Sequence, residues 1–314
     1  MKPVILMSPR LPAAFAERLQ ERYTLIGPIA GTDPSALPPE VREAKALITL
    51  GTHRTDDALM AALPSLGLIL CYGTGFEGVE LGAATRRGLV VTNAGEANAE
   101  AVAEFAMGLV LATGRKIAEG DRYIRAGRWS GNAIERLPLV PGLFGKRIGI
   151  YGLGAIGKRI ATRAAAFGMS IGYYNRRAVA DLPYAYHASL EELARWSDVL
   201  LVAVRASAET RHAVNARILE AVGPQGHVVN ISRGSVVDTE ALCDALERRT
   251  IAGAALDVFE NEPEVPERLR AQENAVLTPH IAAYAASAQS AQQQLLMANL
   301  EAFFAGRPLS SRVN

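Results

Sequence analysis

Three side chains that can bind an anion or transfer a proton follow successive apolar runs in the second half of the chain. Arg233 follows the first of these runs, Glu262 the second and His280 the third. A guanidinium can hold a carboxylate through two parallel hydrogen bonds, a geometry that lysine cannot match. Histidine titrates near neutral pH and can donate a proton, and a carboxylate on its other ring nitrogen would favour the imidazolium. These residue types can therefore hold an anion beside a proton donor.

Each of the three residues also has a simpler interpretation when it is considered alone. Arg233 could pair only with Asp238. Glu262 could be a solvated loop acid, and His280 could cap the turn after Pro279. In an open parallel sheet, however, the carboxyl ends of the strands meet at one ligand crevice. Because all three residues follow predicted strands, a common site is the stronger hypothesis.

A glycine motif supplies a second functional feature. Between an apolar strand and an alanine-rich helix lie Gly152, Leu153, Gly154, Ala155, Ile156 and Gly157. Gly152 permits a tight turn, Gly154 lets the backbone approach a pyrophosphate, and Gly157 lets helix and strand pack closely. The helix that follows would direct N–H groups and a partial positive charge at phosphates. In this context the motif predicts dinucleotide binding.

The residues after the next strand predict which dinucleotide binds. An acidic residue at this place would hold the ribose hydroxyls of NAD, but the sequence reads Asn175, Arg176 and Arg177. Two guanidiniums can bind a 2′-phosphate that a carboxylate would repel. The alternative is that the two arginines only end a solvated loop. We expect NADPH to be preferred over NADH.

The first third of the chain alternates apolar runs with helical patterns. We expect strands at Val4–Met7, Ala46–Thr49, Leu68–Tyr72 and Val90–Thr92. We expect helices at Ala13–Glu21, Asp56–Leu63 and Leu81–Arg87. This alternation predicts an α/β domain with a parallel sheet covered on both faces.

Two glycine-containing loops follow strands of this first domain. The first contains Leu50, Gly51, Thr52 and His53, and the second contains Tyr72, Gly73, Thr74 and Gly75. Glycine lets backbone N–H groups converge on an anion such as a substrate carboxylate. The loops could also be ordinary turns, and the pattern leaves both interpretations open.

The rest of the chain continues the α/β alternation after a connecting helix and an arm. We expect the helix from Ala99 to about Lys116, and an irregular arm at Gly120–Gly145 whose Trp129 makes a dimer contact. Strands are expected at Val199–Val204, His227–Ile231, Gly253–Asp257 and Ala275–Leu277. Ser189 and Glu192 fit a capping box, Asp238 starts a helix that ends near Arg249, and a last helix runs from about Ser287 to Ala305.

Composition narrows the class of protein. A chain of 314 residues with 49% apolar content is long enough for two domains, and its net charge of +1 favours neither nucleic acid nor an acidic membrane as a partner. Cys71 and Cys243 lack metal-ligand spacing and are most simply packing residues in a reducing compartment. No segment approaches the length of a membrane span, so we expect a cytoplasmic protein.

Four motifs, in the right order along the chain, resemble the D-isomer-specific 2-hydroxyacid dehydrogenase family. They are Gly152–Gly157, Asn230–Asp238, Ala255–Pro263 and Thr278–Ile281. Within that family the chain is most similar to glyoxylate/hydroxypyruvate reductases and hydroxyphenylpyruvate reductases. The resemblance implies two doubly wound parallel-sheet domains. A flavodoxin-like substrate domain would comprise residues 1–97 and 285–314, and a Rossmann domain residues 98–284. It also implies a homodimer built on the Rossmann domain.

The resemblance assigns roles to individual residues. The catalytic residues would be Arg233, Glu262 and His280. The cofactor site would comprise the glycine motif, Asn175 to Arg177, and Val204, Thr210, Ile231, Ser232, Arg233, Asp257 and His280, with Asp257 orienting the nicotinamide carboxamide. The substrate would contact Leu50, Gly51, Tyr72, Gly73, Thr74, Gly75, Arg233 and His280. The expected reaction is NADPH-dependent reduction of a small 2-keto acid.

The sequence departs from the family pattern at several positions, and rival functions exist. Arg205 could extend the 2′-phosphate site or point to solvent, Tyr284 could change the preferred substrate size, and Phe76 and Glu77 replace smaller or different residues in many relatives. A non-catalytic corepressor-like partner protein that senses NAD(P), or a reductase of bulkier aryl pyruvates, is the alternative. A formate dehydrogenase would carry an amide at Glu262, and a phosphoglycerate dehydrogenase an acid near Asn175.

Overall fold

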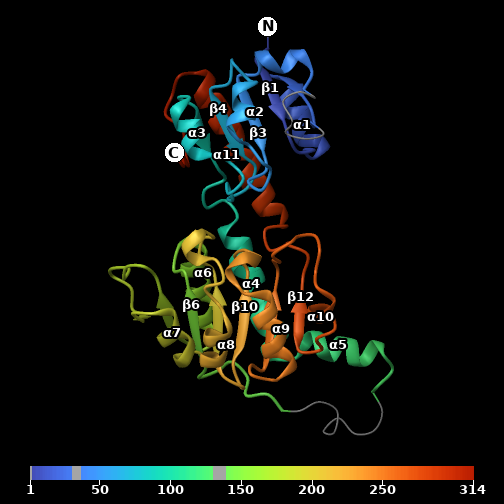
Figure 1. The fold of residues 1–314 in the computed structure, drawn as a ribbon, viewed down its shortest axis with the longest axis vertical. Helices are drawn as coiled ribbons and strands as arrows, with labels where there is room; N and C mark the ends of the chain where they lie inside the picture. The colour runs from blue at the N-terminus through green and yellow to red at the C-terminus, as the bar shows by residue number, and fades with distance from the viewer. Residues whose placement is uncertain (1, 30–36, 130–138) are drawn as a thin grey trace. The chain divides into compact units, whose positions relative to one another are not determined.

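The computed structural model describes residues 2–29, 37–129 and 139–314. Contacts within the chain divide it into two compact units, the first formed by Met1–Asn98 and Ala285–Asn314 and the second by Ala99–Tyr284. Each unit is a parallel sheet with helices on both faces (Figure 1), which confirms the predicted fold class.

The first unit has a five-stranded parallel sheet in the order β2-β1-β3-β4-β5. Its strands are β1 (Val4–Met7), β2 (Thr24–Ile26), β3 (Ala46–Thr49), β4 (Leu68–Cys71) and β5 (Val90–Thr92). This is the strand order of flavodoxin-like doubly wound sheets. The buried strands are continuous apolar runs because both faces of the sheet are covered.

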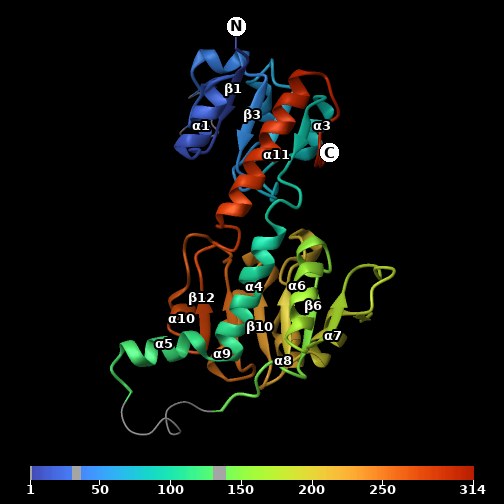
Figure 2. The same ribbon diagram turned by 180° about the vertical axis from the view of Figure 1, so that it is seen from behind.

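Two pairs of helices cover this sheet. One face packs against α1 (Ala13–Gln20) and α11 (Ala286–Phe304), through Phe15, Leu296 and Leu300 among others. The other packs against α2 (Asp57–Ala61) and α3 (Leu81–Arg86). In Figure 2, α11 runs along the sheet of this unit, so the last helix of the chain completes the first domain.

The second unit has a seven-stranded parallel sheet in the order β12-β11-β10-β9-β6-β7-β8. Its strands are β6 (Arg147–Tyr151), β7 (Ser170–Tyr174), β8 (Ala185–Tyr186), β9 (Val199–Val202), β10 (His227–Asn230), β11 (Gly253–Leu256) and β12 (Ala275–Leu277). The order reverses between β6 and β9. Ligands of Rossmann folds bind at such a switch point.

Alternate residues of these strands face opposite helix layers. Val199 and Leu201 pack with α4 (Ala99–Gly114) and α6 (Ala155–Ala166). Leu200 and Val202 pack with α7 (Leu190–Trp196), α8 (Ala216–Val222) and α9 (Thr239–Glu247). The predicted N-caps hold, since Ser189 accepts from the N–H of Glu192 and Asp238 from that of Ala241.

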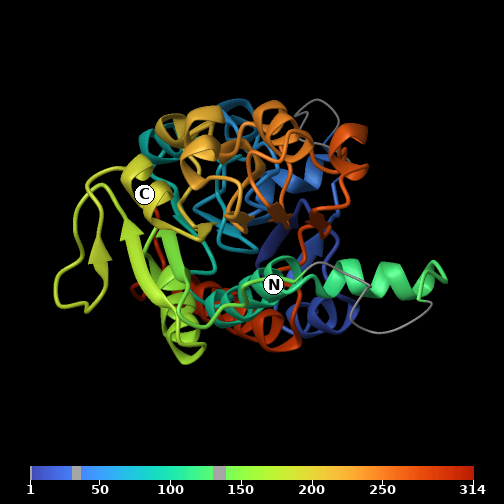
Figure 3. The ribbon, with the colours of Figure 1, turned by 90° about the horizontal axis from the view of Figure 1, so that it is seen from below.

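The prediction of an irregular arm at Gly120–Gly145 is wrong for its first residues. The structure places α5 at Ile117–Arg125, so residues 120–125 are helical, while residues 130–138 of the arm lie outside the described residues. Lys116 has φ 53°, which breaks the helical path after α4 and lets α5 begin in a new direction. Figure 3 shows α5 extending to one side of its unit. Three elements were not predicted, namely the partly exposed β2, the exposed β8 and the short α10 (Glu267–Arg270).

Candidate active site

The glycine turn between β6 and α6 has the geometry expected of each of its glycines. Gly152 has φ +103°, and a Cβ on it would lie 2.5 Å from the backbone nitrogen of Val204. A Cβ on Gly157 would lie 2.3 Å from the carbonyl oxygen of Gly152. Around Gly154, by contrast, a Cβ would meet no described atom within 4 Å. The turn is therefore tight on its inner side and open at Gly154, which suits the approach of a phosphate to the backbone.

The start of α6 adds hydrogen-bond donors to this open side. The helix begins at Ala155, and no side chain caps it at Gly154. The first N–H groups of a helix have no intrahelical acceptor, so those of Ala155, Ile156 and Gly157 suit a bound anion. Asn175 stabilises the turn from the other side, because its Oδ1 accepts from the N–H of Leu153 at 2.7 Å. Its amide therefore links the glycine turn to the end of β7.

Arg176 and Arg177 are exposed just after β7. Arg176 lies near Glu209, whose pKa is lowered by hydrogen bonds from Ser207 and its own backbone and, to a smaller extent, by the Arg176 charge. Thr210 has a local role, since its hydroxyl accepts from the Ser207 N–H at 2.8 Å and donates to the Arg205 carbonyl at 3.1 Å. Thr210 thus shapes the loop that faces Arg176.

His280 and Glu262 form a hydrogen-bonded pair. His280 Nδ1 lies 2.7 Å from Glu262 Oε2, and Glu262 Oε1 accepts from the N–H of Phe259 at 3.0 Å. Partial burial raises the pKa of Glu262, but the bonds from His280 and Phe259 and the charge of Arg233 outweigh it and hold the pKa below its ordinary value. Glu262 is therefore a charged acceptor that orients the imidazole, and not only a solvated loop acid.

Asp257 organises the turn that carries His280. Its buried carboxylate accepts from the Thr278 hydroxyl at 2.6 Å and from the N–H groups of Ile281 and Ala282 at 2.9 and 2.8 Å. The N–H of His280 donates to the Asp257 carbonyl at 2.8 Å, and His280 has φ 52°. Both carboxylate oxygens are thus already hydrogen-bonded, and these contacts make Asp257 the residue that shapes the His280 turn.

Arg233 lies in the loop after β10, within electrostatic reach of Glu262. Asn230 fixes this loop, because its Nδ2 donates to the Arg233 carbonyl and its Oδ1 accepts from the N–H of Ser232, both at 3.0 Å. The Ser232 hydroxyl donates to the carbonyl of Val204, which packs on Gly152. Ile231 is buried beneath the loop. The predicted catalytic and cofactor residues of the second unit therefore follow the carboxyl ends of its parallel strands, from β12 at one edge to β7 near the other.

The two predicted substrate loops interlock within the first unit. A Cβ on Gly51 would lie 1.9 Å from the carbonyl oxygen of Gly75, so only glycine fits there. The carbonyls of Gly73 and Thr74 accept from the N–H of Ala94 and from Asn93 Nδ2, both at 2.7 Å. Leu50 and Tyr72 begin the two loops. Within the described ranges, the N–H groups of Gly73 to Gly75 have no protein acceptor. These donors suit an anion.

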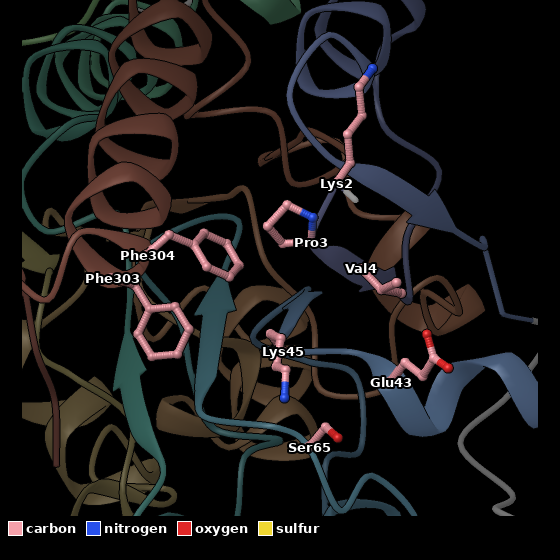
Figure 4. A pocket seen from close by; sticks show the side chains of 8 residues that line it. All are labelled: Lys2, Pro3, Val4, Glu43, Lys45, Ser65, Phe303 and Phe304. Carbon is pink, nitrogen blue, oxygen red and sulfur yellow. The ribbon is translucent and has the colours of Figure 1, made fainter.

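A cavity elsewhere in the first unit lies away from these loops. It measures about 560 Å³ and is lined by Lys2, Pro3, Val4, Glu43, Lys45, Ser65, Phe303 and Phe304 (Figure 4). Its lining residues come from the amino ends of β1, β3 and β4 and the end of α11. The predicted loops follow the opposite, carboxyl ends of β3 and β4, so this cavity is separate from them.

Both cysteines are buried and free, as expected of packing residues. Burial raises the pKa of Cys71 to about 12, so its thiol stays protonated. Among the helices that the structure describes, none is long and apolar enough to cross a bilayer.

Sequence reasoning missed a second histidine–carboxylate pair beside the first. His212 Nε2 lies 2.6 Å from Glu260 Oε1. The available signal was weak, since Glu260 stands in the same acidic run as Glu262 and nothing in the sequence marks His212 as its partner.

Comparisons with known proteins agree over nearly the whole chain. Residues 107–282 match the family described as "D-isomer specific 2-hydroxyacid dehydrogenase, NAD binding domain". A glyoxylate/hydroxypyruvate reductase of Arabidopsis thaliana is 38% identical over 99% of this chain and 97% of its own. A hydroxyphenylpyruvate reductase of Plectranthus scutellarioides is 39% identical over 87% of each chain. The crystal structure of an NADPH-dependent glyoxylate/hydroxypyruvate reductase of Sinorhizobium meliloti, in complex with NADP and malonate, has TM-score 0.92 and 39% identity and covers 100% of this chain and 97% of that one.

Proposed function

Because the chain belongs to the D-isomer-specific 2-hydroxyacid dehydrogenase family, we propose that it reduces a small 2-keto acid of the glyoxylate or hydroxypyruvate type to the D-2-hydroxy acid, with NADPH preferred over NADH. The observation that carries the proposal is the His280–Glu262 hydrogen bond within electrostatic reach of Arg233. These groups supply what keto-acid reduction needs, namely a proton donor and a fixed cation.

The residues present fit a nicotinamide dinucleotide. The open space at Gly154 and the uncapped start of α6 suit its pyrophosphate, and Arg176 and Arg177 suit a 2′-phosphate. When bound, the reduced nicotinamide supplies the hydride. The structural neighbour that carries NADP supports this choice of cofactor.

The chain's own residues then have distinct roles. Arg233 binds the substrate carboxylate and polarises its keto group. His280 donates its proton to the keto oxygen as the alcohol forms, while Glu262 holds the ring in place and stabilises its cationic form. In the first unit, the glycine loops carry backbone N–H donors that suit a carboxylate.

The test is a turnover panel of glyoxylate, hydroxypyruvate, pyruvate and hydroxyphenylpyruvate, each with NADPH and with NADH. We expect the highest kcat/KM with glyoxylate or hydroxypyruvate and NADPH. Absence of turnover with every keto acid, together with tight NADPH binding, would instead support a non-catalytic protein that senses the cofactor.

A reductase of bulkier aryl pyruvates is the second candidate. The 39% identity to a hydroxyphenylpyruvate reductase favours it. Tyr284, which is 79% exposed after the His280 turn, is an aromatic side chain available for a bulky substrate. A higher kcat/KM with hydroxyphenylpyruvate than with glyoxylate would select this candidate.

A further inference from the structure

His212 contacts both loops that carry the proposed catalytic residues. Its backbone N–H donates to the carbonyl of Ser235 at 2.8 Å, two residues after Arg233. Its Nε2 lies 2.6 Å from Glu260 Oε1, two residues before Glu262. One residue therefore joins the loop after β10 to the loop after β11.

The backbone around His212 is itself fixed to the Arg233 loop. The N–H of Val214 donates to the carbonyl of Val236, and the N–H of Asp238 donates to the carbonyl of Val214, both at 3.0 Å. Val214 and Val237 thereby form a parallel bridge. The backbone that carries His212 is thus fixed to the backbone of the loop that carries Arg233.

The loop after β11 is supported by packing and by polar contacts. A cavity of about 310 Å³ separates part of it from α9, with Phe259 and Glu260 on one side and Leu242 on the other. The loop does touch the Arg233 loop directly, since a Cβ on Gly234 would lie 1.9 Å from the carbonyl carbon of Phe259. Phe259 also packs against the core of the second unit, and the hydrogen bonds of Glu260 add to this packing.

Glu260 provides those hydrogen bonds as a charged acceptor. Its side chain is 19% exposed, and it accepts from His212 and from Thr239 at the start of α9. Burial raises its pKa, but these two partners outweigh burial and hold the pKa below its ordinary value. Asp238 Oδ2 lies 3.9 Å from His212 Nδ1, and Arg211 lies 3.5 Å from Glu260. The imidazole therefore lies between two carboxylates, which stabilise its position.

We propose that His212 is a positioning residue, which through Ser235 and Glu260 holds Arg233 and Glu262 at the separation that keto-acid reduction requires. This inference rests on the proposed function, because it assigns the two loops their catalytic roles. A misplacement of about 1 Å at a reacting centre can lower the rate by about 100-fold, so fastening two loops has a measurable effect on turnover.

The test compares His212→Asn and Glu260→Ala with their double variant. Asparagine tolerates the φ of 49° at position 212 but is too short to reach Glu260. Arg249→Asn is the matched control, because Arg249 has φ 57° at the far end of α9. We expect His212→Asn to lower kcat by about tenfold while KM for NADPH stays within about twofold. The double variant should lose less than the two single variants together, because both single substitutions break the same His212–Glu260 contact.

Amide hydrogen exchange gives a readout that does not depend on turnover. We expect faster exchange in His212→Asn at both 233–237 and 258–262, and unchanged exchange in Arg249→Asn. Unchanged exchange in both loops overturns the proposal. A fall in kcat that is accompanied by a similar fold-loss of NADPH affinity and by a lower Tm also overturns it, because the substitution then destabilises the whole unit. If the parent chain reduces no 2-keto acid, the proposed function fails, and the exchange result still decides whether His212 joins the loops.

Discussion

At the scale of single residues, proton delivery depends on which atom of His280 remains available. Nδ1 is bonded to Glu262 at 2.7 Å, so Nε2 is the nitrogen that can face a substrate. The turn that presents the ring is fixed by Asp257 through three hydrogen bonds. The ring is thus held at one nitrogen and through its backbone, which leaves the proton at the other nitrogen for transfer.

Replacing His280 by glutamine should separate chemistry from cofactor binding. Glutamine can still bond to Glu262 but has no proton to release near neutral pH. We expect His280→Gln to lower kcat for keto-acid reduction by about 10²–10⁴-fold. NADPH affinity, measured by fluorescence titration, should be unchanged. His187→Gln, at a histidine of the same unit that lies against Trp196, is the control and should retain turnover. Retained turnover in His280→Gln would exclude it as the proton donor.

The two arginines after β7 should determine the choice between NADPH and NADH. Each guanidinium bonded to a 2′-phosphate contributes about 1.5 kcal/mol or more, which corresponds to about tenfold in affinity. Because both guanidiniums are removed, we expect Arg176→Ala with Arg177→Ala to lower kcat/KM for NADPH by about 100-fold and to leave kcat/KM for NADH within about twofold. The control variant Arg248→Ala removes a comparable charge at the end of α9, and its preference for NADPH over NADH should match that of the parent chain. An unchanged ratio of kcat/KM for NADPH to kcat/KM for NADH in the double variant would contradict the assignment of the two arginines to the 2′-phosphate.

The sequence predicted which residues form much of the candidate site, but it did not predict the hydrogen bonds between them. Arg233, Glu262 and His280 could be proposed because each follows an apolar strand, and parallel strands bring such positions to one edge of the sheet. The His212–Glu260 contact joins residues 48 apart, and its existence depends on how two loops pack. For the same reason the sequence could not show that the Asp257 carboxylate bonds to the His280 turn.

At the scale of elements, the close packing of β6 and α6 depends on Gly157. Alanine normally stabilises a helix relative to glycine by about 0.5–1 kcal/mol. At Gly157, however, its Cβ would approach the Gly152 carbonyl to 2.3 Å. We expect Gly157→Ala to lower both Tm and NADPH affinity. Gly108→Ala in α4, where a Cβ meets no described atom within 4 Å, should leave Tm equal or higher. Equal Tm changes in the two variants would refute the packing argument.

The junction of β6 and β9 should lose stability in acid through Asp198. Burial raises the pKa of Asp198, but bonds from the Arg147 backbone and side chain and the charge of Lys146 hold it below its ordinary value of 3.8. The unfolded chain therefore binds more protons in this range, and stability rises with pH. The contribution is complete above pH 3.8 and disappears as the pH falls through the lower folded pKa.

Asp198→Asn tests this linkage. At pH 7 the variant should have a smaller free energy of unfolding than the parent, measured by urea denaturation. The difference between the two should shrink as the pH is lowered toward about 2, because the parent carboxylate then becomes protonated. A difference that does not change with pH would mean that packing, and not charge, is lost.

Strands were predicted where burial makes them continuous apolar runs, as in Val4–Met7 and Ala46–Thr49. The strands that were missed lack this signal, since Thr24 is exposed and both residues of β8 are exposed. The helix α5 was missed because it follows a left-handed Lys116 and none of its residues is buried. Sequence patterns report burial within a unit, so elements on its surface leave a weaker signal.

At the scale of the whole molecule, the two units carry different sets of candidate functional residues. The second unit carries the glycine turn with Arg233, Glu262 and His280, and the first carries interlocked loops with open N–H donors. Because α11 returns the chain to the first unit, that unit is built from both ends of the sequence. Truncation before α11 would remove Leu296 and Leu300 from the first unit's core.

The surface of α5 points to a second copy of the chain. Ile117 and Ile124, seven residues apart and so on one helical face, are 58% and 48% exposed, and Trp129 just beyond the helix is 56% exposed. Leu139 and Phe144 are 101% and 87% exposed in the same region of the chain. Large exposed apolar side chains are typical of protein interfaces, and we propose a homodimer in which a second copy of the chain covers the face of α5 that carries Ile117 and Ile124.

Association through α5 can be tested by changing only the polarity of its apolar face. We expect the parent chain to sediment as a dimer, and the Ile117→Asp, Ile124→Asp variant to sediment as a monomer at micromolar concentration, because two carboxylates would have to be buried unpaired. The control variant Ile117→Leu, Ile124→Leu keeps the face apolar and should remain dimeric. Circular dichroism should show the same helix content in both variants, since aspartate costs an exposed helix only about 0.7 kcal/mol per residue. A dimeric aspartate variant would place the interface on another surface, and a monomeric parent would refute the homodimer.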